Sequence, residues 1–525
     1  MVTDGPMASS RVTAILGVML PTIGNVVFVA LFFVLTFNSG RGLLADGDTG
    51  YHIRTGELIL QTWRVPKEDV YSFHSPPLQW TAHEWMAEII MAAIFKVSDL
   101  TGVVVFFAFL LAITHWLLYQ TLRTRSNDIL LCTFITILAT ATSSSHWLAR
   151  PHAFSLLLTV IWCHCLDRFQ YKHDRTLIYL PLIMLLWVNL HGGYFFGLIL
   201  LVIYLAGNVV YSLVGRPDQI RQYRMKAKSL LLVLVATVGI CIINPHGFEI
   251  LWFPIRVTSD RFVMDRVTEF MSPNFHEALP FKYMFLTAIS MLALSRSTLN
   301  LIEVALISLL SYMALYSGRY VSLFAIIAAP LLLRTGESII ARIPERFLQF
   351  YRKRNRNLIA IDTKLHGYVW PTISALFIVG LVLTGALRHQ FNDKIFPVAA
   401  IEFLKKETIP GNMFNNDEFG DYIIFAAWPK YRVFMDGRSD MYGEKHGNAY
   451  LKVANVQPGW KEILSKYDIS WIIFDTHSAL AAALRDQRDW QPIYSDRVAT
   501  IFVKKDPGHE SLLTRHPAVI LPFEH

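Results

Sequence analysis

Long stretches without charged residues recur along the first three quarters of this chain. We read about eleven apolar runs there, and a helix needs about 20 apolar residues to cross a bilayer. Only 17% of the 525 residues are charged, whereas soluble globular proteins carry about 25%. These features predict a polytopic α-helical membrane protein. The expected spans centre near residues 26, 111, 137, 160, 183, 204, 237, 288, 307, 327 and 379.

The basic residues between these runs predict an orientation. Short connections rich in Lys and Arg stay on the cytoplasmic side of a membrane. Basic clusters fall at 123–125, 168–175, 216–228 and 334–364, and they alternate with the expected spans. We therefore expect the N-terminus inside and the C-terminal domain outside. Because the basic residues lie mostly in these short loops, anionic membrane lipid is the expected partner, and no nucleic acid.

The same alternation leaves most of the unusual polar strings on the outer side. They are "DGDTGYHIRTG", "SSSHWLARPH", "NLHGG", "NPHGFEI" and "YSGRY". Chance would scatter such strings over both sides of the membrane. Because polar and ionisable residues at membrane depth usually serve a function, the asymmetry predicts a site at the outer boundary.

Composition divides the chain into two parts. Residues 1–390 contain the expected spans and a long first outer loop at 38–83. "HEWMAEIIMAAIFKV" follows this loop with apolar residues at helical spacing, and we expect it to lie on the outer surface before the next span begins near Val103. Residues 391–525 are typical of a soluble α/β domain, with strands expected at "YRVFMDG", "ISWIIFD" and "VATIFVKK" and helices at "PGWKEILSKY" and "HSALAAALRDQRDW".

Asp46 and Asp48 form the first candidate site, just beyond the first span. An Asp-x-Asp pair suits a divalent cation bound through oxygen, or a carboxylate that acts as a general base. A solvated Asp-Gly turn is the simpler alternative. The position of the pair beside a span favours a functional role.

Arg150 and Arg319 are cations on the outer side, where the positive-inside bias does not place them. Each could bind a phosphate, but Arg150 could also extend to the interface, and Arg319 could pair with an internal carboxylate. Several histidines share this side, His52 and His152 among them, at spacings that match no standard zinc site. We expect hydrogen-bonding roles for most of them and a ligand role for one or two.

Asp421, Asp436 and Arg438 follow strand-like segments of the C-terminal domain. "MDGRSD" could simply be a solvated turn that ends a strand. Because this domain is expected over the same face as Asp48, these residues are also candidates to bind a substrate.

These motifs together resemble the GT-C class of membrane glycosyltransferases. The likeness rests on "DGD", "HIRTG", "AHEW", "NLHGG", "NPHG" and the late "DGR", in a chain with many spans and an outer α/β domain. The chain is similar to a bacterial family of this class, and more distantly to the catalytic subunit of oligosaccharyltransferase, whose outer-domain motif has its nearest counterpart here in "EFGDYI".

The resemblance implies a bacterial inner-membrane enzyme with a periplasmic site. It would move a sugar from a polyprenyl-phosphate-linked donor to a glycan, lipid or protein acceptor. Asp48, with Asp46, would activate the acceptor or hold Mg²⁺ or Mn²⁺. Donor phosphate would meet Arg150, Arg319, His152 and His52, and acceptor would meet Asp421, Asp436 and Arg438.

Two other functions remain open at this stage. A transporter or flippase of a lipid-linked glycan would predict mid-span charges and inverted repeats, and the sequence has few such charges and no visible repeat. A non-catalytic scaffold, whose C-terminal domain binds a partner, would tolerate the loss of Asp48.

Overall fold

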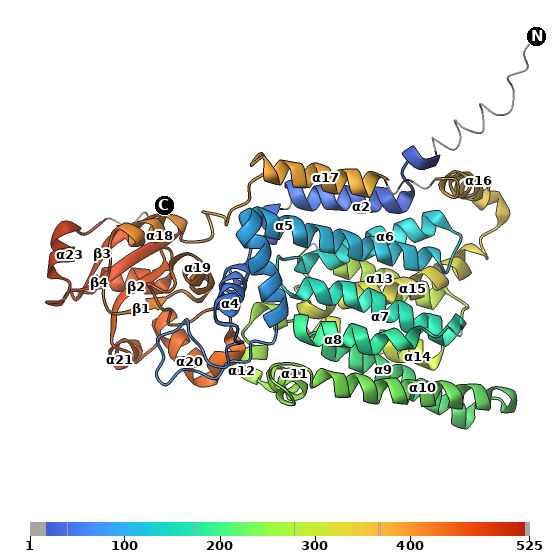
Figure 1. Cartoon of the computed structure of the whole chain (residues 1–525), viewed down its shortest axis with the longest axis horizontal. Helices are drawn as coiled ribbons and strands as arrows, with labels where there is room; N and C mark the ends of the chain where they lie inside the picture. Colours follow the sequence, from blue (N-terminus) through green and yellow to red (C-terminus); the bar gives the residue numbers. More distant parts are fainter. Residues whose placement is uncertain are drawn as a thin grey trace, which may run out of the picture.

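A bundle of helices and a smaller α/β domain lie along the long axis of the protein (Figure 1). The computed structural model describes residues 17–38, 40–172, 174–277, 279–365, 367 and 369–519. Residues 1–16 of the predicted membrane part and residues 520–525 of the predicted C-terminal domain lie outside the described residues.

The bundle and its connections contain the elements from α2 to α17. They are α2 (Ile23–Phe33), the π-helical turn η1 (Val34–Asn38), α3 (Gly40–Leu43), α4 (Asp48–Thr62), α5 (Trp85–Arg123), α6 (Ile129–Ser143), η2 (Ser144–His146), α7 (His152–Lys172), η3 (Thr176–Tyr179), α8 (Leu180–Leu190), α9 (Tyr194–Val214), α10 (Pro217–Cys241), α11 (Glu249–Ser259), α12 (Arg261–Met264), η4 (Thr268–Phe270), α13 (Pro280–Leu294), α14 (Leu301–Tyr316), η5 (Gly318–Tyr320), α15 (Val321–Ile340), α16 (Glu345–Asp362) and α17 (Val369–Leu383).

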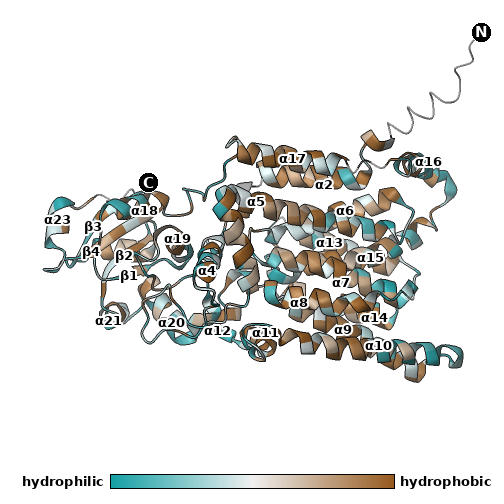
Figure 2. Cartoon of the chain, in the orientation of Figure 1, coloured by the Kyte–Doolittle hydropathy of each residue, from teal (hydrophilic) through white to brown (hydrophobic). Residues whose placement is uncertain are grey.

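Each of the predicted span centres falls within one of these helices. Five helical stretches of the described chain are long and apolar enough to cross a membrane: Gly17–Phe37, Trp85–Arg123, Ile129–His146, Tyr194–Val214 and Gly318–Ile340. Shorter apolar helices lie at Thr176–Leu190, Pro280–Leu294, Leu301–Tyr316 and Val369–Leu383. The prediction of a polytopic α-helical membrane protein is therefore confirmed (Figure 2).

Helix α5 changes direction where the sequence predicts a surface helix to end. It has 39 residues, about 58 Å at 1.5 Å per residue, which exceeds the hydrocarbon thickness of about 30 Å. Ser98 and Asp99 leave helical geometry, and Asp99 has a φ of 49°. This kink separates a first segment beside α4 from the segment that joins the bundle (Figure 1).

Helix α4 occupies the first half of the predicted outer loop. Its buried residues lie around most of its circumference, because α5 packs on one side and α19 (Asp417–Ala427) on another. Gly50 permits the second contact, since a Cβ at this position would lie 2.7 Å from Cβ of Phe425. A polar, glycine-containing helix enclosed in this way lacks the apolar stripe by which a surface helix is recognised.

The C-terminal domain carries a four-stranded sheet in the order β1-β2-β4-β3. Strand β2 pairs parallel with β1 and antiparallel with β4, with Trp471 opposite both Met413 and Val503. The remaining elements are α18 (Val398–Lys406), β1 (Asn412–Asn415), α20 (Ser439–Ala454), α21 (Trp460–Lys466), β2 (Ile469–Asp475), α22 (Ala479–Arg485), β3 (Trp490–Ser495), β4 (Ala499–Lys504) and α23 (Glu510–Arg515). The α/β class is confirmed, and "ISWIIFD" and "VATIFVKK" form β2 and β4.

The strand expected at "YRVFMDG" was wrong. Within this segment only Val433 makes a bridge, to Ser72 of the first outer loop. The amide of Val433 donates to the carbonyl of Tyr71 at 3.0 Å, and the amide of Phe73 donates to the carbonyl of Val433 at 3.3 Å. The segment is extended and buried because it joins two parts of the chain, not because it belongs to the sheet.

The two ends of the bundle differ in character. The basic helix α16 and the turn between α9 and α10 lie at one end, and the C-terminal domain lies at the other (Figure 1). The outer loops that the sequence analysis grouped together, including α4 and the residues around Arg150, gather at the domain end. The structure thus brings the predicted site and the C-terminal domain together.

Candidate functional site

The guanidinium of Arg150 is the centre of the candidate site. Arg150 precedes α7, and its side chain is only 13% exposed. Its Nη1 lies 2.6 Å from an oxygen of Asp46 and 2.6 Å from an oxygen of Glu269, while its Nη2 lies 2.5 Å from Oδ2 of Asp48. Three carboxylates therefore surround one cation. Burial alone would lower the pKa of Arg150, but these carboxylates raise it well above its usual value.

The local turn before α4 explains how both aspartates reach this cation. The amide of Asp48 donates to Oδ1 of Asp46 at 2.8 Å, which leaves Oδ2 of Asp46 for Arg150. Asp48 then lies in the first turn of α4, where the helix dipole favours a negative charge. The spacing of the Asp-x-Asp pair therefore aims both carboxylates at one group.

Glu269 was missed in the sequence analysis, and it links the two predicted arginines. Its Oε2 lies 3.9 Å from Nε of Arg319, whose side chain is 30% exposed and lies over the ring of Phe270. Burial alone would raise the pKa of Glu269, but Arg150 and Arg319 hold it far below its usual range. A single Glu in "VTEFMSP" carries no motif, so only the folded chain reveals this contact. Arg319 keeps the more open guanidinium of the two.

Asp421 brings the C-terminal domain into the site. Both of its oxygens accept from the amide of Gly437 at 3.1 Å. A Cβ on Gly437 would lie 2.3 Å from Oδ1 of Asp48 and 2.8 Å from Oδ2 of Asp421. The glycine of "DGR" therefore leaves room for two carboxyl groups that come from different parts of the chain.

Two buried carboxyl groups this close together resist being ionised at the same time. Burial raises the pKa of Asp421, and the nearby charges of Asp48 and Asp436 raise it further. Burial also raises the pKa of Asp48, but Arg150 opposes this effect. Because Nη2 of Arg150 lies 2.5 Å from Asp48, we infer that a proton held by this pair lies on Asp421 and that Asp48 is the carboxylate.

His52 and His152 line the site without contacting Arg150. His52 lies one turn after Asp48 on α4, and its Nδ1 lies 3.1 Å from Oε1 of Glu88 while its Nε2 lies 3.6 Å from Glu84. Nε2 of His152 donates to the carbonyl of His146 at 2.9 Å. Both rings are buried. The contacts of both rings are with other groups of the protein, as expected for side chains that stabilise the surroundings of the site. Contact of His52 and His152 with donor phosphate stays a prediction.

Arg438 and Asp436 form a buried contact between the domain and the loop that joins α4 to α5. Nη2 of Arg438 lies 2.6 Å from Asp436 and 2.8 Å from Asp69, and these side chains are at most 1% exposed. The guanidinium also lies over the rings of Trp80 and Tyr71. Asp436 and Arg438 are enclosed by these contacts, and acceptor binding stays a prediction for them. Acceptor binding stays a prediction for Asp421.

The two aspartates do not fit a divalent cation as they are arranged. Mg²⁺ and Mn²⁺ prefer several carboxylate, carbonyl or water oxygens around an open position. Here the guanidinium of Arg150 already contacts the oxygens with which Asp46 and Asp48 would bind a metal ion. Among the described residues, no group of three His, Cys, Asp or Glu side chains is arranged to hold a metal ion. The positive charge next to the two aspartates is therefore that of Arg150.

Comparison with known proteins identifies the architecture. No protein-family model matches the chain, and no curated protein matches it. A crystal structure of ArnT from Cupriavidus metallidurans bound to undecaprenyl phosphate matches with a TM-score of 0.50 and 12% identity, over 92% of this chain and 98% of that one. The same protein in the apo state matches with a TM-score of 0.44 and 12% identity, over 91% of this chain and 97% of that one. The fold is GT-C-like.

Proposed function

We propose that this chain is a membrane glycosyltransferase that uses a polyprenyl-phosphate-linked sugar. The observation that carries the proposal is the buried Arg150 at one end of a membrane bundle, shared by the carboxylates of Asp46, Asp48 and Glu269. The GT-C-like fold supports the same class. The bundle helices supply the apolar surface that a polyprenyl tail needs. A bacterial inner-membrane location with a periplasmic site is part of this proposal.

In the proposed reaction, Asp48 is the base and the arginines receive the leaving phosphate. The acceptor hydroxyl oxygen attacks C1 of the sugar, and the bond between C1 and the phosphate oxygen breaks. The electron pair stays on the phosphate, and the hydroxyl proton passes to Asp48. Donor phosphate would compete with the carboxylates for Arg150 and Arg319, which would free Asp48 to accept that proton. A preorganised cation at developing negative charge accelerates such steps by about 10²–10³-fold per group.

The test is turnover of a panel of radiolabelled polyprenyl-phosphate sugars by the purified full chain. Asp48→Asn keeps the shape of the side chain and removes the base. Asp393→Asn is the matched control, because Asp393 is an exposed aspartate outside the site. We expect the wild type and Asp393→Asn to consume a donor and Asp48→Asn to lose at least about 10²-fold in rate. Normal turnover by a stably folded Asp48→Asn would remove Asp48 from the reaction.

A further inference from the structure

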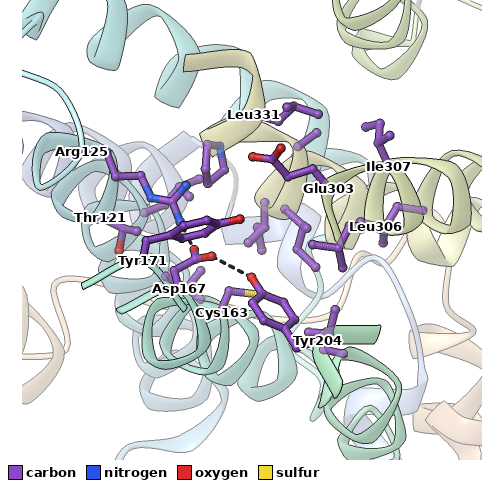
Figure 3. A pocket seen from close by; sticks show the side chains of 18 residues that line it. Thr121, Arg125, Cys163, Asp167, Tyr171, Tyr204, Glu303, Leu306, Ile307 and Leu331 are labelled. Atoms are coloured by element: carbon purple, nitrogen blue, oxygen red, sulfur yellow. Dashed lines mark hydrogen bonds and ion pairs between the residues drawn. The ribbon is translucent and has the colours of Figure 1, made fainter. Parts of the chain in front are cut away.

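A second polar cluster lies about one helix length away from Arg150. It lines a cavity between α5, α7, α9, α14 and α15 that holds about 760 Å³, its open mouth included (Figure 3). Arg150 precedes α7, whereas Tyr171 of the cavity lies in its last turn, and 21 helical residues span about 30 Å. The cavity therefore lies at the opposite boundary of the bundle and is separate from the candidate sugar-transfer site.

The polar end of this cavity contains charges with unused hydrogen-bonding groups. Asp167 pairs with Arg125 and accepts from the hydroxyl of Tyr204 at 2.7 Å (Figure 3). Oε2 of Glu303 lies 2.7 Å from Nη2 of Arg334. Within the described residues, Nε and Nη1 of Arg125 have no hydrogen-bond acceptor, and Oε1 of Glu303 has no donor. The pocket thus offers free donors and one free carboxylate oxygen.

Tyr171 adds a further donor next to these groups. Nδ2 of Asn300 donates to the Tyr171 hydroxyl at 2.9 Å, so the hydroxyl proton remains available for another partner. Arg125 and Tyr171 therefore form the donor side of the polar end, and Glu303 forms the acceptor side.

The rest of the cavity is apolar and extends toward the middle of the bundle. From the polar end, α5, α7 and α14 continue for 7 to 11 residues to the deepest lining side chains, which is about 10 to 16 Å along the helices. Those side chains are Leu118, Val160, Leu200, Leu310 and Ile326. A polar head at the bundle end and an apolar slot beneath it match a molecule with a charged head group and a hydrocarbon chain.

We propose that this cavity binds a phospholipid whose head group carries both a phosphate and a primary ammonium, such as phosphatidylethanolamine. The phosphate would accept from Arg125 and Tyr171, and the ammonium would donate to Oε1 of Glu303. At this end the charges of Arg125 and Arg334 cancel those of Asp167 and Glu303. A zwitterionic head group keeps this charge balance, because it adds no net charge. A purely anionic head would leave Oε1 of Glu303 without a donor, although Oε2 keeps Arg334, and a trimethylammonium group has no N–H to donate.

The test is lipid binding by the purified full chain in detergent, measured by native mass spectrometry. Phosphatidylethanolamine, phosphatidylcholine and phosphatidylglycerol with identical acyl chains are titrated separately. We expect phosphatidylethanolamine to bind about tenfold more tightly than either of the others, because a charge-assisted hydrogen bond contributes about this factor. Sugar transfer is not part of the measurement, so the outcome is independent of the proposed function.

Two variants separate specific binding from loss of structure. Glu303→Gln keeps the capping contact with Asn300, since glutamine also accepts there, but removes the charge. Tyr171→Phe removes only the hydroxyl. Glu345→Gln is the matched control, because this exposed glutamate lies on α16, outside the cavity. We expect Glu303→Gln to lose the preference for phosphatidylethanolamine, because it removes the partner of the ammonium. Tyr171→Phe should bind all three lipids more weakly, because each carries the phosphate, and the control should bind as the wild type does. Equal binding of all three lipids, tighter phosphatidylglycerol, or a preference unchanged in Glu303→Gln would overturn the proposal.

Discussion

Replacing Gly437 by alanine tests the contact between the C-terminal domain and the base. The new Cβ would lie 2.3 Å from Oδ1 of Asp48, whereas real Cβ atoms stay at least 3.0 Å from such neighbours. The carboxylate of Asp48 must therefore retreat by about 0.7 Å, the difference between these distances. Because misplacing a reacting group by about 1 Å can reduce a rate about 10²-fold, we expect kcat to fall by about this factor.

The assay for this variant is turnover of the polyprenyl-phosphate sugar that the wild type consumes, together with thermal unfolding. Overpacking at Gly437 should cost about 1–3 kcal/mol of stability, which leaves the protein folded at moderate temperature. Gly42→Ala is the matched control, because a Cβ at Gly42 meets no atom within 4 Å. A folded Gly437→Ala variant with full turnover would refute the proposal that Asp48 reacts from this position.

Four further changes test other contacts of the site. Arg438→Met should lower the free energy of unfolding by about 3–5 kcal/mol, since it leaves buried Asp69 and Asp436 unpaired, and denaturant unfolding measures this. Arg150→Lys should reduce kcat about 10²-fold in donor turnover, because one ammonium cannot replace both Nη contacts. Turnover needs ionised Asp48, and burial raises the pKa of this carboxyl group. A pH profile of turnover should therefore show activity above the raised pKa and a loss of activity as the pH falls through it. The loss should occur at a less acidic pH than the usual aspartate value of about 3.9. EDTA should leave turnover unchanged, because Arg150 occupies the position where a divalent cation would bind. A loss of turnover in EDTA that Mg²⁺ restores would contradict this expectation.

The membrane bundle could be predicted from the sequence because burial in lipid imposes a simple rule. Every span must satisfy its backbone within a helix and present apolar side chains, so each run of apolar residues marks its own helix. Helices α9 and α15 follow this rule directly. The sequence also indicated a first helix that ends at Val97 and a span that begins near Val103, and α5 kinks between them at Ser98 and Asp99.

The enclosed elements could not be predicted in this way. Helix α4 is polar and is buried by α5 and α19, so its sequence shows no stripe of either period. The segment around Val433 has the composition of a strand, but its partner is Ser72, more than 350 residues earlier in the chain. Local patterns do not identify partners at such separations.

The candidate site was only partly predictable, because local patterns reveal single unusual residues but not the residues that they contact. Asp48, Arg150 and Arg319 stood out because charges at the ends of apolar runs are rare. Glu269 stood out in no way, since a single glutamate in a polar loop is common. Arg438 was identified as a candidate, but the sequence could not show that Asp69 lies against it.

The most direct test of the central claim is the stoichiometry of the reaction in proteoliposomes. Labelled polyprenyl-phosphate sugar is supplied with an acceptor fraction, and released polyprenyl phosphate and transferred sugar are counted together. We expect the wild type to release one polyprenyl phosphate for each sugar transferred, and Asp48→Asn to form neither product. Movement of intact donor across the bilayer without release of polyprenyl phosphate would contradict it.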